Sequence, residues 1–118
     1  MERIRHLNPQ LDIFGGYEEV MAAAIALGAA GSIGSTFNFM SGHFRKLFDL
    51  ARAGQAREAL RLQEKANNIM DALCAEGLVP AIKYALSLFG FSAGEARRPF
   101  LPLGEDAKAR GHRRKPNG

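Results

Sequence analysis

Residues 11–19 read LDIFGGYEE, and residues 31–38 read GSIGSTFN. In both segments a short apolar run stops beside glycine, and polar side chains follow at once. A stretch of helical character, residues 17–28, separates the two runs. Strands that alternate with helices form parallel sheets, and such sheets present ligand-binding groups at the carboxyl ends of their strands. The sequence therefore predicts two parallel strands, over residues 11–14 and 32–34, with a binding edge where they end.

Helices dominate the rest of the chain, after a polar loop predicted for residues 1–10. Apolar residues recur at helical spacing over residues 41–53, 55–76 and 80–89, and a glycine follows each of these segments. The chain has 118 residues, too few for a closed eight-stranded barrel, which needs roughly 200 or more. A sheet usually needs at least three strands for stability. The excess of helix over strand predicts the tail end of a larger α/β barrel followed by extra helices.

Composition excludes several classes of function. The net charge of +4 lies mostly in the tail, because residues 1–103 hold 11 Lys/Arg against 10 Asp/Glu, whereas residues 104–118 hold five against two. We interpret this tail as disordered rather than as a nucleic-acid site. No run of about 20 apolar residues exists, so no membrane span is expected. Cys74 is the single cysteine, which excludes an intrachain disulfide and favours a reducing, cytoplasmic setting; its helical position predicts a small buried side chain.

Both predicted strands end in recognisable motifs. The first reads Gly16-Tyr17-Glu18-Glu19, and the second reads Ile33-Gly34-Ser35-Thr36-Phe37-Asn38. They resemble the ends of the seventh and eighth barrel strands in the N-acetylneuraminate lyase family, which read Gly-Tyr-Asp-Glu and Ile-Gly-Ser-Thr-Tyr-Asn. Three further segments resemble that family: Ala51-Arg52-Ala53-Gly54, Leu62-Gln63 and Arg97-Arg98-Pro99-Phe100. The resemblance is specific and extends over nearly the whole chain.

The resemblance implies an α/β fold, namely the C-terminal portion of a TIM (β/α)8 barrel followed by a three-helix C-terminal extension. Residues 1–40 would form the last two strand–helix units of the aldolase barrel. Residues 41–103 would form the helical extension, and residues 104–118 the basic, disordered tail. The intact family, as the resemblance implies, is homo-oligomeric, with a tetramer expected. For this chain we expect no cofactor and no metal.

The resemblance also implies a chemistry. A lysine forms a Schiff base with the keto group, and N-acetylneuraminate is cleaved reversibly to pyruvate and N-acetylmannosamine. That lysine and an assisting tyrosine belong to earlier strands, so no catalytic residue is expected in this chain. Gly16, Glu18, Glu19 and Ser35 match the family positions that hold the hydroxyl-bearing chain of sialic acid or a related sugar acid. Carboxylates suit that role because they accept hydrogen bonds from several hydroxyls.

Two departures from the family pattern keep alternatives open. Glu18 stands where the family usually has aspartate, and Phe37 replaces a common tyrosine. The parent protein could therefore be another pyruvate-dependent aldolase of the dihydrodipicolinate synthase family, and the chain could also be a non-enzymatic helical interaction module. His6, His43 and His112 lack metal-ligand spacing, so we predict no metal site.

The first testable prediction concerns the activity of the chain by itself. We expect no pyruvate release from N-acetylneuraminate, because neither Lys46 nor Lys83 stands at the end of a predicted strand. A coupled assay for pyruvate and borohydride trapping of a pyruvate adduct provide the two measurements. Turnover together with a trapped adduct on either lysine would contradict this interpretation.

Overall fold

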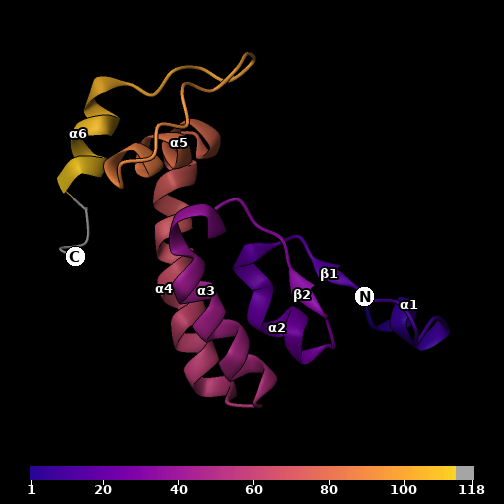
Figure 1. Cartoon of the computed structure of the whole chain (residues 1–118). Coiled ribbons are helices and arrows are strands. Elements are labelled where there is room, and N and C mark those ends of the chain that lie inside the picture. Colours follow the sequence, from indigo (N-terminus) through magenta and orange to yellow (C-terminus); the bar gives the residue numbers. More distant parts are fainter. Residues whose placement is uncertain (114–118) are drawn as a thin grey trace. The chain divides into compact units, whose positions relative to one another are not determined.

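The two predicted strands form a parallel pair (Figure 1). β1 comprises Phe14–Gly15 and β2 comprises Gly31–Ser32, paired residue by residue in that order. A hydrogen bond of 2.8 Å from Ala30 N to Ile13 O extends the pairing beyond the strands. The parallel pairing is confirmed, but each strand is shorter than predicted. The computed structural model describes residues 1–113.

The connection between the strands begins with a turn and continues as a helix. A 3₁₀ turn, Glu18–Val20, leads into helix α2, Met21–Ala26. Three apolar side chains of α2 are buried: Met21, Ala24 and Ile25. Helix α2 contacts both β1 and α3, so it covers the strand pair from one side. The helix predicted over residues 17–28 is therefore present but shorter, because its first residues form the tight turn that closes β1.

The amino terminus is helical where the sequence predicts a loop, so that prediction is wrong. Helix α1 comprises Glu2–Leu7 and buries none of its residues. Glu2 occupies its first turn, and Arg5 and His6 occupy its last turn, which suits the helix dipole. The Arg5 guanidinium also donates a hydrogen bond to the Gly28 carbonyl. These polar contacts, rather than an apolar face, account for a helix that hydrophobic periodicity does not predict.

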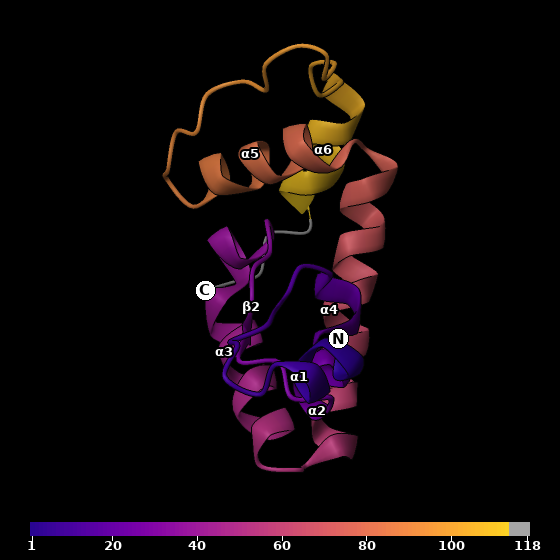
Figure 2. The same cartoon turned by 90° about the vertical axis from the view of Figure 1, so that its right-hand side faces the viewer.

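Two long helices follow β2 and lie side by side (Figures 1 and 2). They are α3, Phe37–Arg52, and α4, Ala56–Ala75. Helix α3 has a kink at Met40, where φ is −118° and ψ is 22°, so the helix predicted from Ser41 is the part after the kink. Before residue 69, four apolar residues of the two helices are buried: Phe44, Leu47, Ala59 and Ala66. Because α3 packs against α2, this core supports the strand pair.

Contacts divide the chain into two units, residues 1–68 and residues 69–118. The second unit contains the end of α4 together with α5, Leu78–Leu88, and α6, Glu105–Arg113. Helices α5 and α6 contact each other. Helix α5 begins two residues earlier than predicted, because Gly77 adopts a φ of +91° that turns the chain sharply after α4.

Helix α6 shows that the prediction of a disordered tail is wrong for the part of the tail that the structure describes. Two acidic residues occupy its first turn, where the helix dipole favours them. Lys108 pairs with Glu105 at 2.6 Å, and this hydrogen bond raises the pKa of Lys108. Arg110 pairs with Glu76 at 2.7 Å. The remaining part of the predicted tail, residues 114–118, lies outside the described residues.

Two other expectations concern Cys74 and the membrane. Cys74 is exposed, so the prediction of a buried side chain is wrong. It lies in the last turn of α4, beyond Met70, which is the last buried residue of that helix. Within residues 1–113, no helix combines the length and the apolar composition needed to cross a membrane.

The second prediction concerns the apolar surface around the strands. Six large apolar side chains in this region are more than half exposed: Leu11, Phe14, Tyr17, Val20, Leu27 and Ile33. We expect the purified chain to bind an apolar fluorescent dye or to associate, because residues 1–113 pair only two strands and leave these side chains exposed. Phe14→Ser should lower dye fluorescence. Leu60→Ser, at a helical site that is also 55% exposed, should lower it less.

One result would contradict this prediction. If the chain is a monomer by light scattering, melts in one sharp transition and binds no dye, the apolar surface around β1 and β2 does not need the rest of a barrel to cover it.

Candidate functional site

The ends of β1 and β2 meet at the side chain of Glu18, which is only 7% exposed. Its carboxylate accepts hydrogen bonds from the Thr36 backbone N–H at 3.2 and 3.3 Å and from the Ser35 hydroxyl at 3.2 Å. The Thr36 hydroxyl donates to the same carboxylate. A buried carboxylate is costly unless it is hydrogen-bonded, so these donors explain how the charge is accommodated. Two predicted site residues, Glu18 and Ser35, are thus in direct contact.

Gly34 makes room for this contact. A Cβ atom built on Gly34 would collide with the Glu18 side chain, including its carboxylate. Glycine is therefore required at this position for steric reasons, because any larger residue would displace the carboxylate from Thr36. The absence of a side chain at Gly34 also gives space to glutamate, which is one methylene longer than aspartate.

The other two predicted site residues remain accessible. Gly16 is exposed, and a Cβ built there would meet no atom within 4 Å. The Glu19 side chain is exposed, and it accepts no hydrogen bond from residues 1–111. With the Ser35 hydroxyl, these residues offer hydrogen-bond acceptors at the carboxyl ends of two adjacent strands. Such a group of acceptors suits a ligand that carries several hydroxyls.

Helix α4 contributes two residues that sequence reasoning does not assign to the site. Gln63 Nε2 donates to the Glu18 carbonyl at 2.8 Å, and Gln63 Oε1 accepts from Ala22 N at 3.0 Å. Asn67 Nδ2 donates to the Glu19 carbonyl at 3.1 Å. The only sequence signal for Gln63 is the Leu62-Gln63 pair, which is one of the segments that resemble the family. Thr36 is also missed, although it lies next to Ser35 in the same motif.

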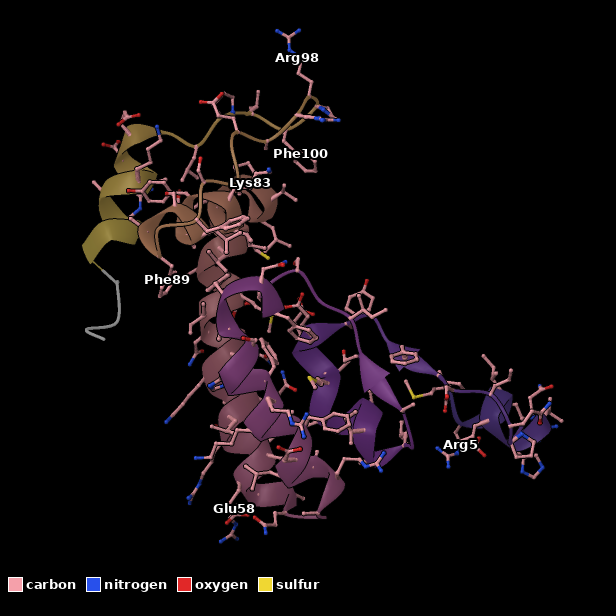
Figure 3. All side chains as sticks on the ribbon, in the orientation of Figure 1. Arg5, Glu58, Lys83, Phe89, Arg98 and Phe100 are labelled. Carbon is pink, nitrogen blue, oxygen red and sulfur yellow. The ribbon has the colours of Figure 1, made fainter. Side chains whose placement is uncertain are left out.

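The described residues contain neither a metal site nor a lysine at a strand end. Within residues 1–111 no group of three or more His, Cys, Asp or Glu side chains could hold a metal ion. Lys46 lies on α3 and is exposed. Lys83 lies on α5 in the second unit, where its Nζ donates to the Ala93 carbonyl at 2.6 Å (Figure 3). The arrangement can therefore bind polar groups, but it offers no amine for Schiff-base formation at the strand ends.

Known proteins resemble this chain in both sequence and structure. It is 43% identical over 105 residues to an N-acetylneuraminate lyase of Rhizobium meliloti, a match that covers 89% of the chain and 35% of that relative. The CdNal protein of Clostridium difficile, solved in complex with mannosamine, is 35% identical with a TM-score of 0.91. The N-acetylneuraminate lyase of Fusobacterium nucleatum is 32% identical with a TM-score of 0.89.

Each of these structures aligns with 95% of this chain, but the aligned part is only 39% of the Clostridium protein and 38% of the Fusobacterium protein. The chain thus spans well under half the length of the relatives it matches. Its structural neighbours have the TIM-barrel fold. The sequence model of the dihydrodipicolinate synthetase family matches residues 1–114. The chain therefore belongs to the dihydrodipicolinate synthetase family.

Proposed function

We propose that this chain is the C-terminal portion of a Schiff-base-forming aldolase of the N-acetylneuraminate lyase type. In the intact protein it would supply the last two barrel strands, part of the sugar-binding rim and the C-terminal helices. The observation that carries the proposal is the contact between the two strand ends, which brings Ser35 against Glu18 and leaves Gly16 and Glu19 exposed beside them. The reaction would be the reversible cleavage of N-acetylneuraminate to pyruvate and N-acetylmannosamine.

Each of the four residues has a distinct role in this proposal. Ser35 donates its proton to Glu18, so its lone pairs are left to accept a hydrogen bond from a sugar hydroxyl. Glu19 offers an exposed carboxylate to further hydroxyls, and Gly16 lets its backbone carbonyl approach the ligand without a side chain between them. Glu18 contributes its negative charge and holds Ser35 in place. The lysine that forms the Schiff base would come from an earlier strand outside this chain.

The remaining features follow from the family resemblance and, for the cytoplasmic setting, from the single cysteine, Cys74. We propose that the intact protein is cytoplasmic and homo-oligomeric, as a tetramer. Residues 1–40 would correspond to the last two strand–helix units, and the helices after them to the C-terminal extension.

A second candidate is a pyruvate-dependent aldolase of the same family with a different substrate. The position of the Glu18 carboxylate favours it. That carboxylate is occupied by Thr36 and Ser35, so it has less capacity to accept hydrogen bonds from a sugar. A ligand with fewer hydroxyls would suit such a site better than N-acetylneuraminate.

The third prediction tests the proposed function in a completed barrel. The chain is joined to the part of the Rhizobium meliloti relative that precedes the matched segment, and pyruvate release from N-acetylneuraminate is measured. Glu19→Gln should weaken sugar-acid binding by about 1–2 kcal/mol, because charge-assisted hydrogen bonds become ordinary ones. Borohydride trapping of pyruvate should be unchanged, since pyruvate has no polyol chain. Glu58→Gln, in the exposed first turn of α4, is the matched control (Figure 3).

Glu18→Asp in the same joined protein separates the candidates. If the lyase assignment holds, this variant should cleave N-acetylneuraminate at least as well as the parent. If the parent uses a different substrate, the variant should gain on N-acetylneuraminate and lose on that substrate. Equal kinetics for the parent, Glu18→Asp and Glu19→Gln on every sugar acid would contradict the site assignment. A folded joined protein without turnover on any keto acid would favour a helical interaction module.

A further inference from the structure

Helix α4 is attached to the end of β1 by the amide side chain of Gln63. This side chain is only 4% exposed, and both ends of its amide group are used. Its nitrogen donates to the Glu18 carbonyl at 2.8 Å, and its oxygen accepts from Ala22 N at 3.0 Å. One side chain thus holds both sides of the turn that separates β1 from α2.

Asn67, one helical turn further along α4, completes the attachment. Its Nδ2 donates to the Glu19 carbonyl at 3.1 Å, while its Oδ1 accepts the second proton of Gln63 Nε2 at 2.8 Å. The two amides are therefore linked to each other and to two successive carbonyls. Residues four positions apart lie on the same face of a helix, so α4 presents both amides to the turn together.

A carboxamide matches the environment of Gln63. It must donate to one carbonyl and accept from one backbone N–H, and among side chains the carboxamides of Gln and Asn do both at fixed positions. Glutamate would keep the acceptor for Ala22 but place a second acceptor against the Glu18 carbonyl. Leucine would fill similar space but leave both backbone groups unpaired, which is costly at a buried site.

We infer that Gln63 and Asn67 are positioning residues of the strand-end site. They act through the backbone of Glu18 and Glu19, and so set where the two carboxylates lie relative to Ser35 and Thr36. Neither residue needs to touch a ligand. The consequence for sugar-acid binding rests on the proposed function, whereas the consequence for the geometry of the turn does not.

Amide hydrogen exchange in the full 118-residue chain tests the geometric part. Gln63→Leu should speed exchange of the Ala22 amide about tenfold, the factor expected for loss of one hydrogen bond. It should also speed exchange at Thr36, whose N–H depends on the Glu18 carboxylate. Gln63→Glu should speed exchange at Thr36 but leave Ala22 protected, because the acceptor is retained. Glu64→Gln, on the exposed face of α4, should change neither amide.

The amide of Leu47, in the buried part of α3, reports on the fold as a whole. If Gln63→Leu speeds exchange at Leu47 as much as at Ala22 and Thr36, Gln63 supports the fold generally and the inference is wrong. Unchanged exchange at Ala22 in Gln63→Leu would also overturn it. If Gln63→Leu does not fold, Gln63→Glu and Asn67→Asp test the inference in its place. In these variants the inference still requires faster exchange at the Thr36 amide and unchanged exchange at the Leu47 amide.

Kinetics in the joined barrel test the functional part. Gln63→Glu and Asn67→Asp should each raise KM for N-acetylneuraminate about tenfold, with pyruvate trapping unchanged, since only the sugar end of the site moves. A fall in kcat with unchanged KM would overturn the positioning role. If the joined parent shows no turnover, the proposed function fails, but the exchange results still decide whether these amides set the turn.

Discussion

Burying a carboxylate inside a protein costs free energy unless hydrogen-bond donors replace the water that it loses. Glu18 obtains its donors from the end of the neighbouring strand, namely the Thr36 N–H and the hydroxyls of Ser35 and Thr36. The charge is thus stable only when β1 and β2 end at the same place. In the described part of the chain, no buried side-chain nitrogen or oxygen lacks a partner. The rest of the site is built outward from this contact.

Other features of the site follow from the position of that carboxylate. Gly34 must lack a side chain, because a Cβ there would occupy the space of Glu18. Helix α3 begins directly after Thr36, so the same hydrogen bonds also fix the start of the helix that carries Phe44 and Leu47 into the core. On the other side, α4 holds the Glu18 carbonyl through Gln63. A residue that family resemblance assigns to ligand binding therefore also joins two strands and two helices.

Local sequence patterns predicted the elements that depend on local interactions. Two apolar runs ending at glycine indicated the parallel strands, and regular apolar spacing placed α4 within one residue at each end. The same patterns missed α1 and α6, which are polar. Contacts distant in sequence help to hold these helices, namely Arg5 with the Gly28 carbonyl and Arg110 with Glu76. Such pairs are not visible in a single sequence.

In the candidate site, too, the sequence predicted the residues of local motifs and missed the contacts between distant residues. Motifs at the strand ends indicated Gly16, Glu18, Glu19 and Ser35, and the parallel pairing brings Glu18 and Ser35 together. The sequence did not show that the Glu18 carboxylate is already occupied by Thr36, because residue spacing does not determine the direction of a side chain. It also did not reveal Gln63, whose partner Glu18 lies 45 residues earlier.

The most direct test of this account compares Glu18→Ala with Glu19→Ala in the full chain, by urea unfolding followed with circular dichroism. Both changes remove one carboxylate from the same turn, but only Glu18 is buried against Thr36. Glu18→Ala should lower the free energy of unfolding by about 1–3 kcal/mol, because the Thr36 N–H loses its acceptor. Glu19→Ala should change it by no more than about 0.5 kcal/mol, as expected for an exposed side chain. Equal effects of the two substitutions would contradict the account, because the Glu18 carboxylate would then not be what joins the two strand ends.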